Sequence, residues 1–306
     1  MTKTITVIGG PTASGKSGLA MALARAHGHA ATIINADSMQ LYGGLPNLTA
    51  QPPREDMLAI PHRLYGTLNP GQECSAGDWR ELAEPVIAQE LDNTRHPIIV
   101  GGSGLYLNAL LYGLAPIPDT PPEIREAAGR HLDEIGYEAF FEEIHRRDPR
   151  AAAGISPANR NRMIRVWEVY EHTGIPLSEW QKEKRQTPPA DWCFQVLIVL
   201  PDRMNLRYRC DVRLDQMVEA GVLAEIEAFE HAHPEPGLPP KKALGYRPFL
   251  AYLKGHTDWP DAIERAKAET RQYAKRQVTW FRHQVVKQGP VERVEIISDP
   301  SEYVSG

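Results

Sequence analysis

The chain has 306 residues, of which 42% are hydrophobic and 24% are charged, enough to bury a full core in one large domain or in a domain with a smaller insertion. Its three cysteines form no CxxC pair, which argues against a zinc site and a disulfide framework and favours a reducing cytosol. No apolar run approaches the length of a membrane span and no signal sequence precedes the first apolar segment, so we expect a cytoplasmic protein with no membrane partner. We also expect a monomer.

The formal net charge of −5 argues mildly against a nucleic-acid partner, but the basic residues are unevenly distributed. Residues 146–165 contain six arginines and one acid, and residues 241–282 contain ten Lys or Arg and four acids. Residues 203–213 add four arginines and one aspartate. Such clusters are expected where a polyanion binds on one side of an acidic protein, although solvated helix faces give the same pattern.

In chain order, the first predicted elements are a strand at residues 5–8 and an alanine- and leucine-rich helix at 17–27. Further short apolar runs at 32–34, 98–100 and 196–200 predict three more strands, separated by helical stretches. This alternation indicates an α/β fold of the P-loop NTPase type, with a parallel sheet and helices on both faces.

The middle of the chain has a different character. Between two proline-rich segments, at 116–122 and 187–189, the sequence consists of charged helical stretches. We interpret residues 120–189 as an α-helical insertion domain and residues 1–119 and 190–306 as the catalytic core, which ends with a long basic helix at about 259–286.

The strongest motif lies between the first strand and the first helix and fits the pattern G-x-x-x-x-G-K-[ST]. It consists of Gly10, Pro11, Thr12, Ala13, Ser14, Gly15, Lys16 and Ser17. Backbone amides of such a loop bind phosphate oxygens, the lysine adds a positive charge, and the serine hydroxyl ligates Mg²⁺. We predict a site for a diphosphate or a nucleotide.

Two aspartates follow predicted strands. Asp37 comes after the second strand, at the sheet edge where α/β proteins bind ligands, although an aspartate there is equally well explained as a helix N-cap. Asp202 follows the fourth strand behind Pro201, which makes it a poor Mg²⁺ ligand for nucleotide hydrolysis. The loop is therefore interpreted as holding a diphosphate that serves as a leaving group.

Across most of its length the chain resembles the tRNA dimethylallyltransferase family of bacterial type. The segments that carry the resemblance are GPTASGKS at Gly10, ADSMQLY at Ala36, PHRLYG at Pro61, SAGDWR at Ser75, IIVGGSGLYLNALLYGL at Ile98, NRMIRVWEVYEHTG at Asn161, PDRMNLRYRCDVRLDQMVEAG at Pro201, ALGYRPF at Ala243 and TRQYAKRQVTWFR at Thr270. The stretch GLPNLTAQP at Gly44 departs from the family pattern, which leaves the contacts of that loop open.

The resemblance implies transfer of a dimethylallyl group from dimethylallyl diphosphate to N6 of adenine 37 in the tRNA anticodon loop, with Mg²⁺ as cofactor. Asp37 is expected to act as the general base, and Lys16, Ser103, Arg213 and Mg²⁺ on Ser17 are expected to stabilise the leaving diphosphate. Arg209, one helical turn before Arg213, is the candidate for a contact with the tRNA backbone.

The residues expected to contact tRNA fall into three groups along the chain. They are Asp37, Ser38, Met39, Gln40 and Ser103 around the base; Arg125, Asn161, Arg162, Met163, Ile164 and Arg165 in the insertion; and Lys241, Lys242, Tyr246 and Arg247 near the C-terminal helix. Two alternatives stay open: a small-molecule kinase that uses the loop for ATP, and an ATP-dependent RNA-binding switch without catalytic activity.

Overall fold

The computed structural model describes residues 2–28, 30–183, 185–300 and 303. The chain forms two compact units, one of Met1–Tyr112 with Pro188–Gly306, which we call the core unit, and one of Gly113–Thr187, the insertion unit. The proposed boundaries at 119/120 and 189/190 differ from these limits because Leu114 and Gln186 pair as an antiparallel bridge, which joins both connecting segments to the insertion unit.

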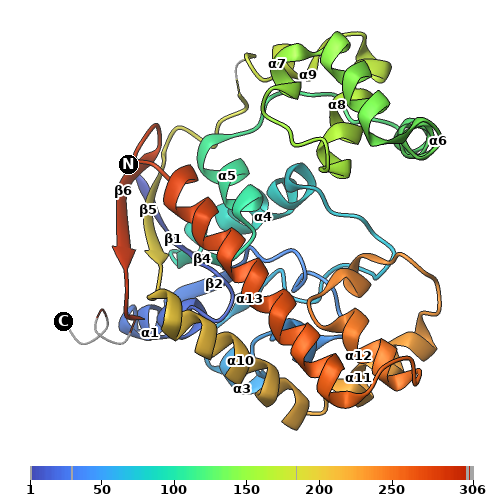
Figure 1. Cartoon of the computed structure of the whole chain (residues 1–306). Coiled ribbons are helices and arrows are strands. Elements are labelled where there is room, and N and C mark those ends of the chain that lie inside the picture. Colours follow the sequence, from blue (N-terminus) through green and yellow to red (C-terminus); the bar gives the residue numbers. More distant parts are fainter. Residues whose placement is uncertain (1, 29, 184, 301–302, 304–306) are drawn as a thin grey trace. The chain divides into compact units, whose positions relative to one another are not determined.

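Within the described residues, the core unit contains one sheet of six strands in the order β3-β2-β4-β1-β5-β6, and every neighbouring pair is parallel (Figure 1). The strands are β1 (Lys3–Gly9), β2 (Ala31–Asn35), β3 (His62–Arg63), β4 (His96–Gly101), β5 (Trp192–Val199) and β6 (Val291–Ile297). The predicted α/β fold and its four apolar strands are confirmed.

The two edge strands, β3 and β6, were not predicted from the sequence. β3 has two residues, which is too short for any periodic signal. β6 reads VERVEII, with Glu292 and Arg293 exposed, so it lacks the continuous apolar run of a strand buried on both faces.

The helices of the core unit connect the strands, singly or in runs. They are α1 (Lys16–Ala26), α2 (Pro46–Thr49), α3 (Arg54–Ala59), α4 (Ala76–Asp92), α5 (Gly104–Tyr112), α10 (Arg203–Glu219), α11 (Val222–Ala232), the 3₁₀ turn η1 (Pro239–Lys242), α12 (Tyr246–Leu253) and α13 (Trp259–Gln284). Helices α10 to α13 are consecutive between β5 and β6.

Both faces of the sheet are covered by helices, as expected from the alternation of side chains along β1. Ile8 faces α1 and belongs to the buried cluster that contains Leu19 and Met21 of that helix. Gly9 faces the other side, where an added Cβ would lie 2.6 Å from Cε1 of Phe281 in α13 and 3.3 Å from Cδ1 of Leu107 in α5. The carboxyl end of β1 therefore lies between α1 on one face and α5 with α13 on the other.

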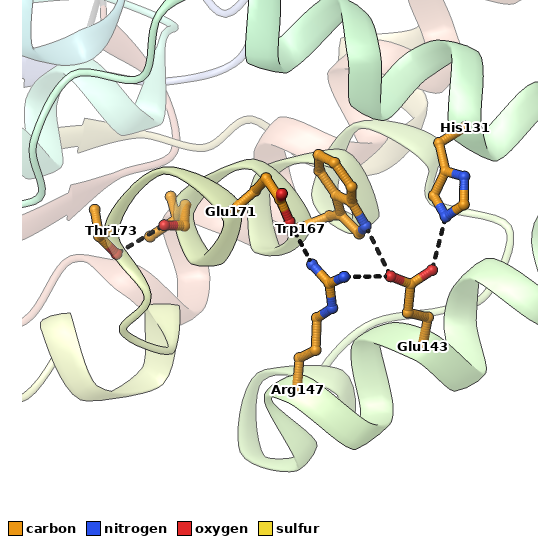
Figure 2. A network of polar contacts seen from close by, with 7 residues as sticks. His131, Glu143, Arg147, Trp167, Glu171 and Thr173 are labelled. Carbon is orange, nitrogen blue, oxygen red and sulfur yellow. Dashed lines mark hydrogen bonds and ion pairs between the residues drawn. The ribbon is translucent and has the colours of Figure 1, made fainter.

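The insertion unit consists of α6 (Pro122–Arg147), α7 (Pro149–Ala152), α8 (Arg160–Thr173) and α9 (Leu177–Trp180), which pack around a core of their own. α6 is kinked at Gly136, whose φ of 80° is outside the helical region. Figure 2 shows polar contacts that join the two halves of α6 to one another and the second half to α8. Glu143 accepts from Trp167 Nε1 at 3.2 Å and lies 2.6 Å from Arg147 Nη2, while His131 Nε2 is 2.8 Å from its other oxygen.

Candidate active site

The predicted phosphate loop connects the end of β1 to the first turn of α1. Gly15 is the N-cap residue of α1 with a left-handed φ of 93°, and Ala13 also has a positive φ, 60°. A side chain at Gly10 is excluded because its Cβ would lie 2.6 Å from the carbonyl oxygen of Val199 in β5. The loop is thus folded over the N-terminus of α1, where helix amides and the positive end of the helix dipole favour a bound phosphate.

Lys16 is the first residue of α1, and its side chain is buried with Nζ 3.4 Å from the carbonyl oxygen of Pro11. Burial lowers the pKa of Lys16 to about 8, while the Asp37 carboxylate raises it and the Arg213 guanidinium lowers it further. Burial likewise lowers the pKa of Arg213, and Asp37 again acts in the opposite direction. Three of the four residues predicted to be catalytic therefore lie within electrostatic reach of one another.

A cavity of about 330 Å³ opens between the phosphate loop and α10. It is lined by Ala13, Ser14, Gly15, Lys16, Ser17 and Gly18 from the loop side and by Tyr208, Arg209, Val212, Arg213 and Gln216 from α10. The Ser14 hydroxyl is fully buried and has no hydrogen-bond partner within the described part of the chain.

Arg209 contacts the phosphate loop. Its Nη1 donates to the Ser14 carbonyl oxygen at 3.3 Å and its Nε donates to Asn205 Oδ1 at 3.1 Å. Arg213 and Arg209 are therefore not divided between the phosphate loop and another surface, and the contact of one of them with the tRNA backbone stays a prediction. Residues four apart lie on one helix face, and both arginines line the cavity at the phosphate loop.

Asp37 lies just beyond β2 and is held by its own segment. Asn35 Oδ1 accepts from the Asp37 amide at 2.8 Å, and Asn35 Nδ2 donates to the Asp37 carbonyl oxygen at 3.0 Å. Asp37 Oδ1 accepts from the amide of Met39 at 3.0 Å, and the residues that follow form a turn. The helix-capping alternative is thus excluded, because no helix begins at Asp37 in this described segment, and Asn35 is a positioning residue that the sequence analysis missed.

Ser103 follows β4 and is hydrogen-bonded to the segment of Asp37. Its Oγ accepts from the Ser38 amide at 2.9 Å and donates to Ser38 Oγ at 3.3 Å. The segment after β4 and the segment after β2 approach closely because Gly101 has no side chain. A Cβ at Gly101 would lie 2.0 Å from the carbonyl oxygen of Ala36. Ser103 and Asp37 are therefore brought to the same edge of the sheet.

Gln40 has a different environment from the one expected for a base-contacting residue. Its Nε2 donates to the carbonyl oxygens of Thr49 at 2.9 Å and Ala50 at 2.7 Å. Met39 packs against the apolar cluster of α10–α13. The amide nitrogen of Gln40 thus supports the loop at 44–52, the part of the chain that departs from the family pattern.

The Asp37 carboxylate also affects the pKa of three tyrosines that were not predicted as site residues. The pKa values of Tyr65, Tyr106 and Tyr273 are all raised, mainly by burial and further by the Asp37 carboxylate; that of Tyr273 reaches about 12. They come from three separate segments, and no spacing in the sequence indicates that they meet near Asp37.

The predicted tRNA residues near α12 divide into buried and exposed pairs. Lys241 Nζ lies 2.8 Å from a carboxylate oxygen of Glu230, which also accepts from the Tyr246 hydroxyl at 2.6 Å. Both side chains are buried, so a phosphate contact from Lys241 or Tyr246 would require breaking this network. Lys242 and Arg247 are exposed. The structure therefore favours the exposed pair for a contact with a polyanion.

Among the insertion residues, Met163 and Ile164 are buried in the core of α6–α9. Their predicted tRNA contact does not agree with this packing, because their side chains point into the unit. Asn161 and Arg162, at the start of the same helix, are exposed. The alternation follows from the helical periodicity of α8, which brings one face to the core and the other to solvent.

Arg165 and Arg125 converge on one buried carboxylate. Arg165 Nη1 donates to Glu168 Oε1 at 2.7 Å, and Arg125 Nε lies 3.7 Å from Glu168 Oε2. Both arginines keep a large part of their side chains accessible, 39% for Arg165 and 61% for Arg125, so each is placed by Glu168 and still open to a further anion.

The described residues contain no group of three His, Cys, Asp or Glu side chains that would hold a metal ion. None of their helices combines the length and the apolar character that a membrane crossing requires.

Together, the parallel sheet, the glycine-rich loop at a helix N-terminus and the cationic cavity define an α/β phosphate-binding protein of the P-loop type. A model of the family described as IPP transferase matches residues 40–284. The chain belongs to this family.

Relatives and solved structures agree with the assignment. The chain is 45% identical to a tRNA dimethylallyltransferase of Rhodospirillum centenum, over 93% of this chain and 90% of the relative, and 46% identical to one of Paramagnetospirillum magneticum, over 94% and 91%. It is similar to the tRNA isopentenylpyrophosphate transferase of Bacillus halodurans, at 30% identity and a TM-score of 0.65, covering 100% of this chain and 94% of the other. A eukaryotic dimethylallyltransferase acting on tRNA has 28% identity and a TM-score of 0.79, covering 98% and 75%.

Proposed function

We propose that this protein transfers the dimethylallyl group of dimethylallyl diphosphate to N6 of adenine 37 in the anticodon loop of tRNA. Membership of the family makes it a tRNA prenyltransferase. The observation that carries the proposal is the shared electrostatic environment of Lys16, Arg213 and Asp37, because it combines an anion-binding cavity with a carboxylate at the same edge of the sheet.

The carboxylate is needed because the adenine N6 amine is a weak nucleophile. Its lone pair is delocalised into the ring, and the nitrogen must lose a proton as the new C–N bond forms. Asp37, held by Asn35 and by the Met39 amide, accepts this proton through the carboxylate. Fixing the carboxylate in advance removes the cost of orienting it during the reaction.

The diphosphate leaves as the allylic C–O bond breaks, so negative charge grows on its bridging oxygen. The loop amides, the Lys16 ammonium and the Arg213 guanidinium are the donors that meet this charge, and each preorganised donor typically lowers a barrier by a few kcal/mol. Ser103 contributes by holding Ser38 beside Asp37.

The residues present fit Mg²⁺. The ion is satisfied by one hydroxyl together with phosphate oxygens and waters, and Ser17 supplies a hydroxyl in the first turn of α1 beside the cavity. When bound, Mg²⁺ neutralises charge on the diphosphate. Such a site needs no carboxylate cluster.

A tRNA base inside the anticodon loop must leave its stack to reach the cavity, at a cost of a few kcal/mol. Phosphate contacts hold the loop during this step without specifying sequence. We assign these contacts to Arg162, Arg165 and Arg125 of the insertion unit and to Lys242 and Arg247 of the core unit, all of which are exposed except the partly exposed Arg165. We place the enzyme in the cytoplasm, where its tRNA substrate is, and expect it to act as a monomer.

The kinase alternative is less well supported. A P-loop kinase places Mg²⁺ with a carboxylate near the end of a neighbouring strand. Asp202, which follows β5, instead accepts from the amides of Met204 and Asn205, both at 3.0 Å, and caps α10. Both amides bond Oδ1, so Asp202 is oriented by the helix cap.

The test is to incubate the protein with dimethylallyl diphosphate, Mg²⁺ and unmodified tRNA and to measure the mass of the nucleosides released by digestion. We expect adenosine with one added dimethylallyl group, and a ribonuclease digest to oligonucleotides should place it in the fragment that contains position 37. A parallel reaction with ATP and no prenyl donor measures phosphate release. Phosphate release without prenyl transfer would replace our proposal by the kinase.

A further inference from the structure

One side chain joins the phosphate loop to the end of β4. Gln277 lies in α13 and is 6% exposed. Its Oε1 accepts from the Thr12 amide at 2.8 Å, and its Nε2 donates to the Gly102 carbonyl oxygen at 2.9 Å. Both ends of the amide are therefore hydrogen-bonded to backbone, on two segments that are ninety residues apart in the sequence.

The fit around this amide is close. A Cβ at Gly102 would lie 2.5 Å from Gln277 Nε2 and 3.3 Å from the Gly10 carbonyl oxygen. Glycine at this position thus lets the side chain and the loop approach the backbone of β4. Because the contacts are made by one planar group, they fix the spacing between the loop and Gly102.

Each of these two segments leads directly to a functional group. Thr12 belongs to the loop that lines the anion cavity, and Gly102 precedes Ser103, whose hydroxyl holds the Ser38 amide beside Asp37. A shift at either end of the Gln277 amide would change the distance between the diphosphate and the proton-accepting carboxylate. Transfer reactions are sensitive to displacements of about 1 Å.

We propose that Gln277 is a positioning residue for the prenyl transfer: its side-chain amide sets the spacing between the diphosphate-binding loop and the Ser103–Asp37 segment. This inference rests on the proposed function. Gln277 acts through Thr12 and Gly102 and does not itself touch the reacting atoms.

The informative substitution is Gln277→Glu. An ionised glutamate still accepts from the Thr12 amide but places an oxygen against the Gly102 carbonyl oxygen, where a donor is required. A protonated glutamate restores the donor. Because burial raises the pKa of a carboxyl group, the change between these states is expected in an accessible pH range.

The experiment measures kcat and KM for dimethylallyl diphosphate between about pH 6 and pH 8.5, together with the Kd of inorganic diphosphate with Mg²⁺ and the Kd of tRNA. Relative to wild type, Gln277→Glu should lose about 10- to 100-fold in kcat/KM at the upper end and recover most of it at the lower end. The affinity for tRNA should stay unchanged. Gln277→Met, which has neither donor nor acceptor, should be impaired at every pH.

Gln272→Glu is the matched control, since it makes the same chemical change at an exposed position of the same helix. Thermal melting at each pH identifies the conditions in which the variants are folded. The inference is overturned if folded Gln277→Glu follows the pH profile of Gln272→Glu, or if Gln277→Met keeps wild-type kinetics and diphosphate affinity. If wild type binds diphosphate but transfers no prenyl group, the proposed function fails, and the pH dependence of diphosphate binding by Gln277→Glu still decides the role of Gln277.

Discussion

The lowered pKa of Lys16 predicts that diphosphate binding weakens as the pH rises through about 8. Burial is the main cause, so the ammonium form is favoured below this pH and the neutral amine above it. At about pH 7 roughly nine-tenths of the unliganded protein carries the charged lysine, and at about pH 9 roughly one-tenth does. If the charged form binds the anion, the apparent affinity should fall about 10-fold over these two pH units.

Isothermal titration of Mg²⁺ and inorganic diphosphate into the protein at several pH values measures this effect. Lys16→Arg is the matched control, because a guanidinium stays charged throughout the range and the ratio of the two affinities cancels the ionisation of the ligand. Asp37→Asn should move the midpoint to lower pH, since the Asp37 carboxylate raises the pKa of Lys16, whereas Arg213→Met should move it to higher pH. A wild-type affinity that parallels that of Lys16→Arg from pH 7 to pH 9 would refute the reasoning.

Three further predictions follow from the described contacts. Asp37→Asn should reduce single-turnover transfer by roughly 10²- to 10⁴-fold with little change in the Kd of tRNA, and a defect confined to binding would argue against the general base. Replacing Arg162 or Arg165 by Gln should flatten the slope of log K for tRNA against log salt by up to about 0.7 to 0.9. Lys241→Gln should instead lower the melting temperature, because the contact with Glu230 is lost, and should leave the salt slope unchanged. Equal slopes for all three variants would contradict this division. Burial and the neighbouring His27 lower the pKa of His96 from 6.5 to about 4, so the folded state favours the neutral ring. The protein should therefore lose stability as the pH falls from about 6.5 toward 4. Melting curves of His96→Gln should show a smaller loss over the same pH range.

The sheet and the phosphate loop were predictable because their signals are local. Buried parallel strands read as continuous apolar runs, and a glycine-rich loop between a strand and a helix has a fixed pattern of residue types. The position of Asp37 and Ser103 at one edge of the sheet was also predictable, because both follow such strands and parallel strands end at one edge of the sheet. β6 was missed because an edge strand has no need of a continuous apolar run.

The division between buried and exposed basic residues could not be predicted from charge. Lys241 and Lys242 are adjacent in one basic segment, yet Lys241 is bonded to Glu230 of α11 and Lys242 is exposed. That difference depends on a carboxylate eleven residues away, which no local pattern connects to the lysine. The helical periodicity of α8 was a local signal for the burial of Met163 and Ile164. The prediction that all of residues 161–165 contact tRNA did not take this periodicity into account.

The remaining parts of the site depend on contacts between distant segments. Asn35 is a polar residue at the end of a buried strand, and that polarity was the one signal of its role. Its side chain hydrogen-bonds the amide and the carbonyl oxygen of Asp37 and also donates to the Leu64 carbonyl oxygen at 2.9 Å. Gln277 had no such signal, because a glutamine within a basic helix usually faces solvent. A buried amide must find both a donor and an acceptor, and here the phosphate loop and the end of β4 supply them. The requirement that buried polar groups be paired therefore connects a helix near the C-terminus to the chemistry at the N-terminal strand.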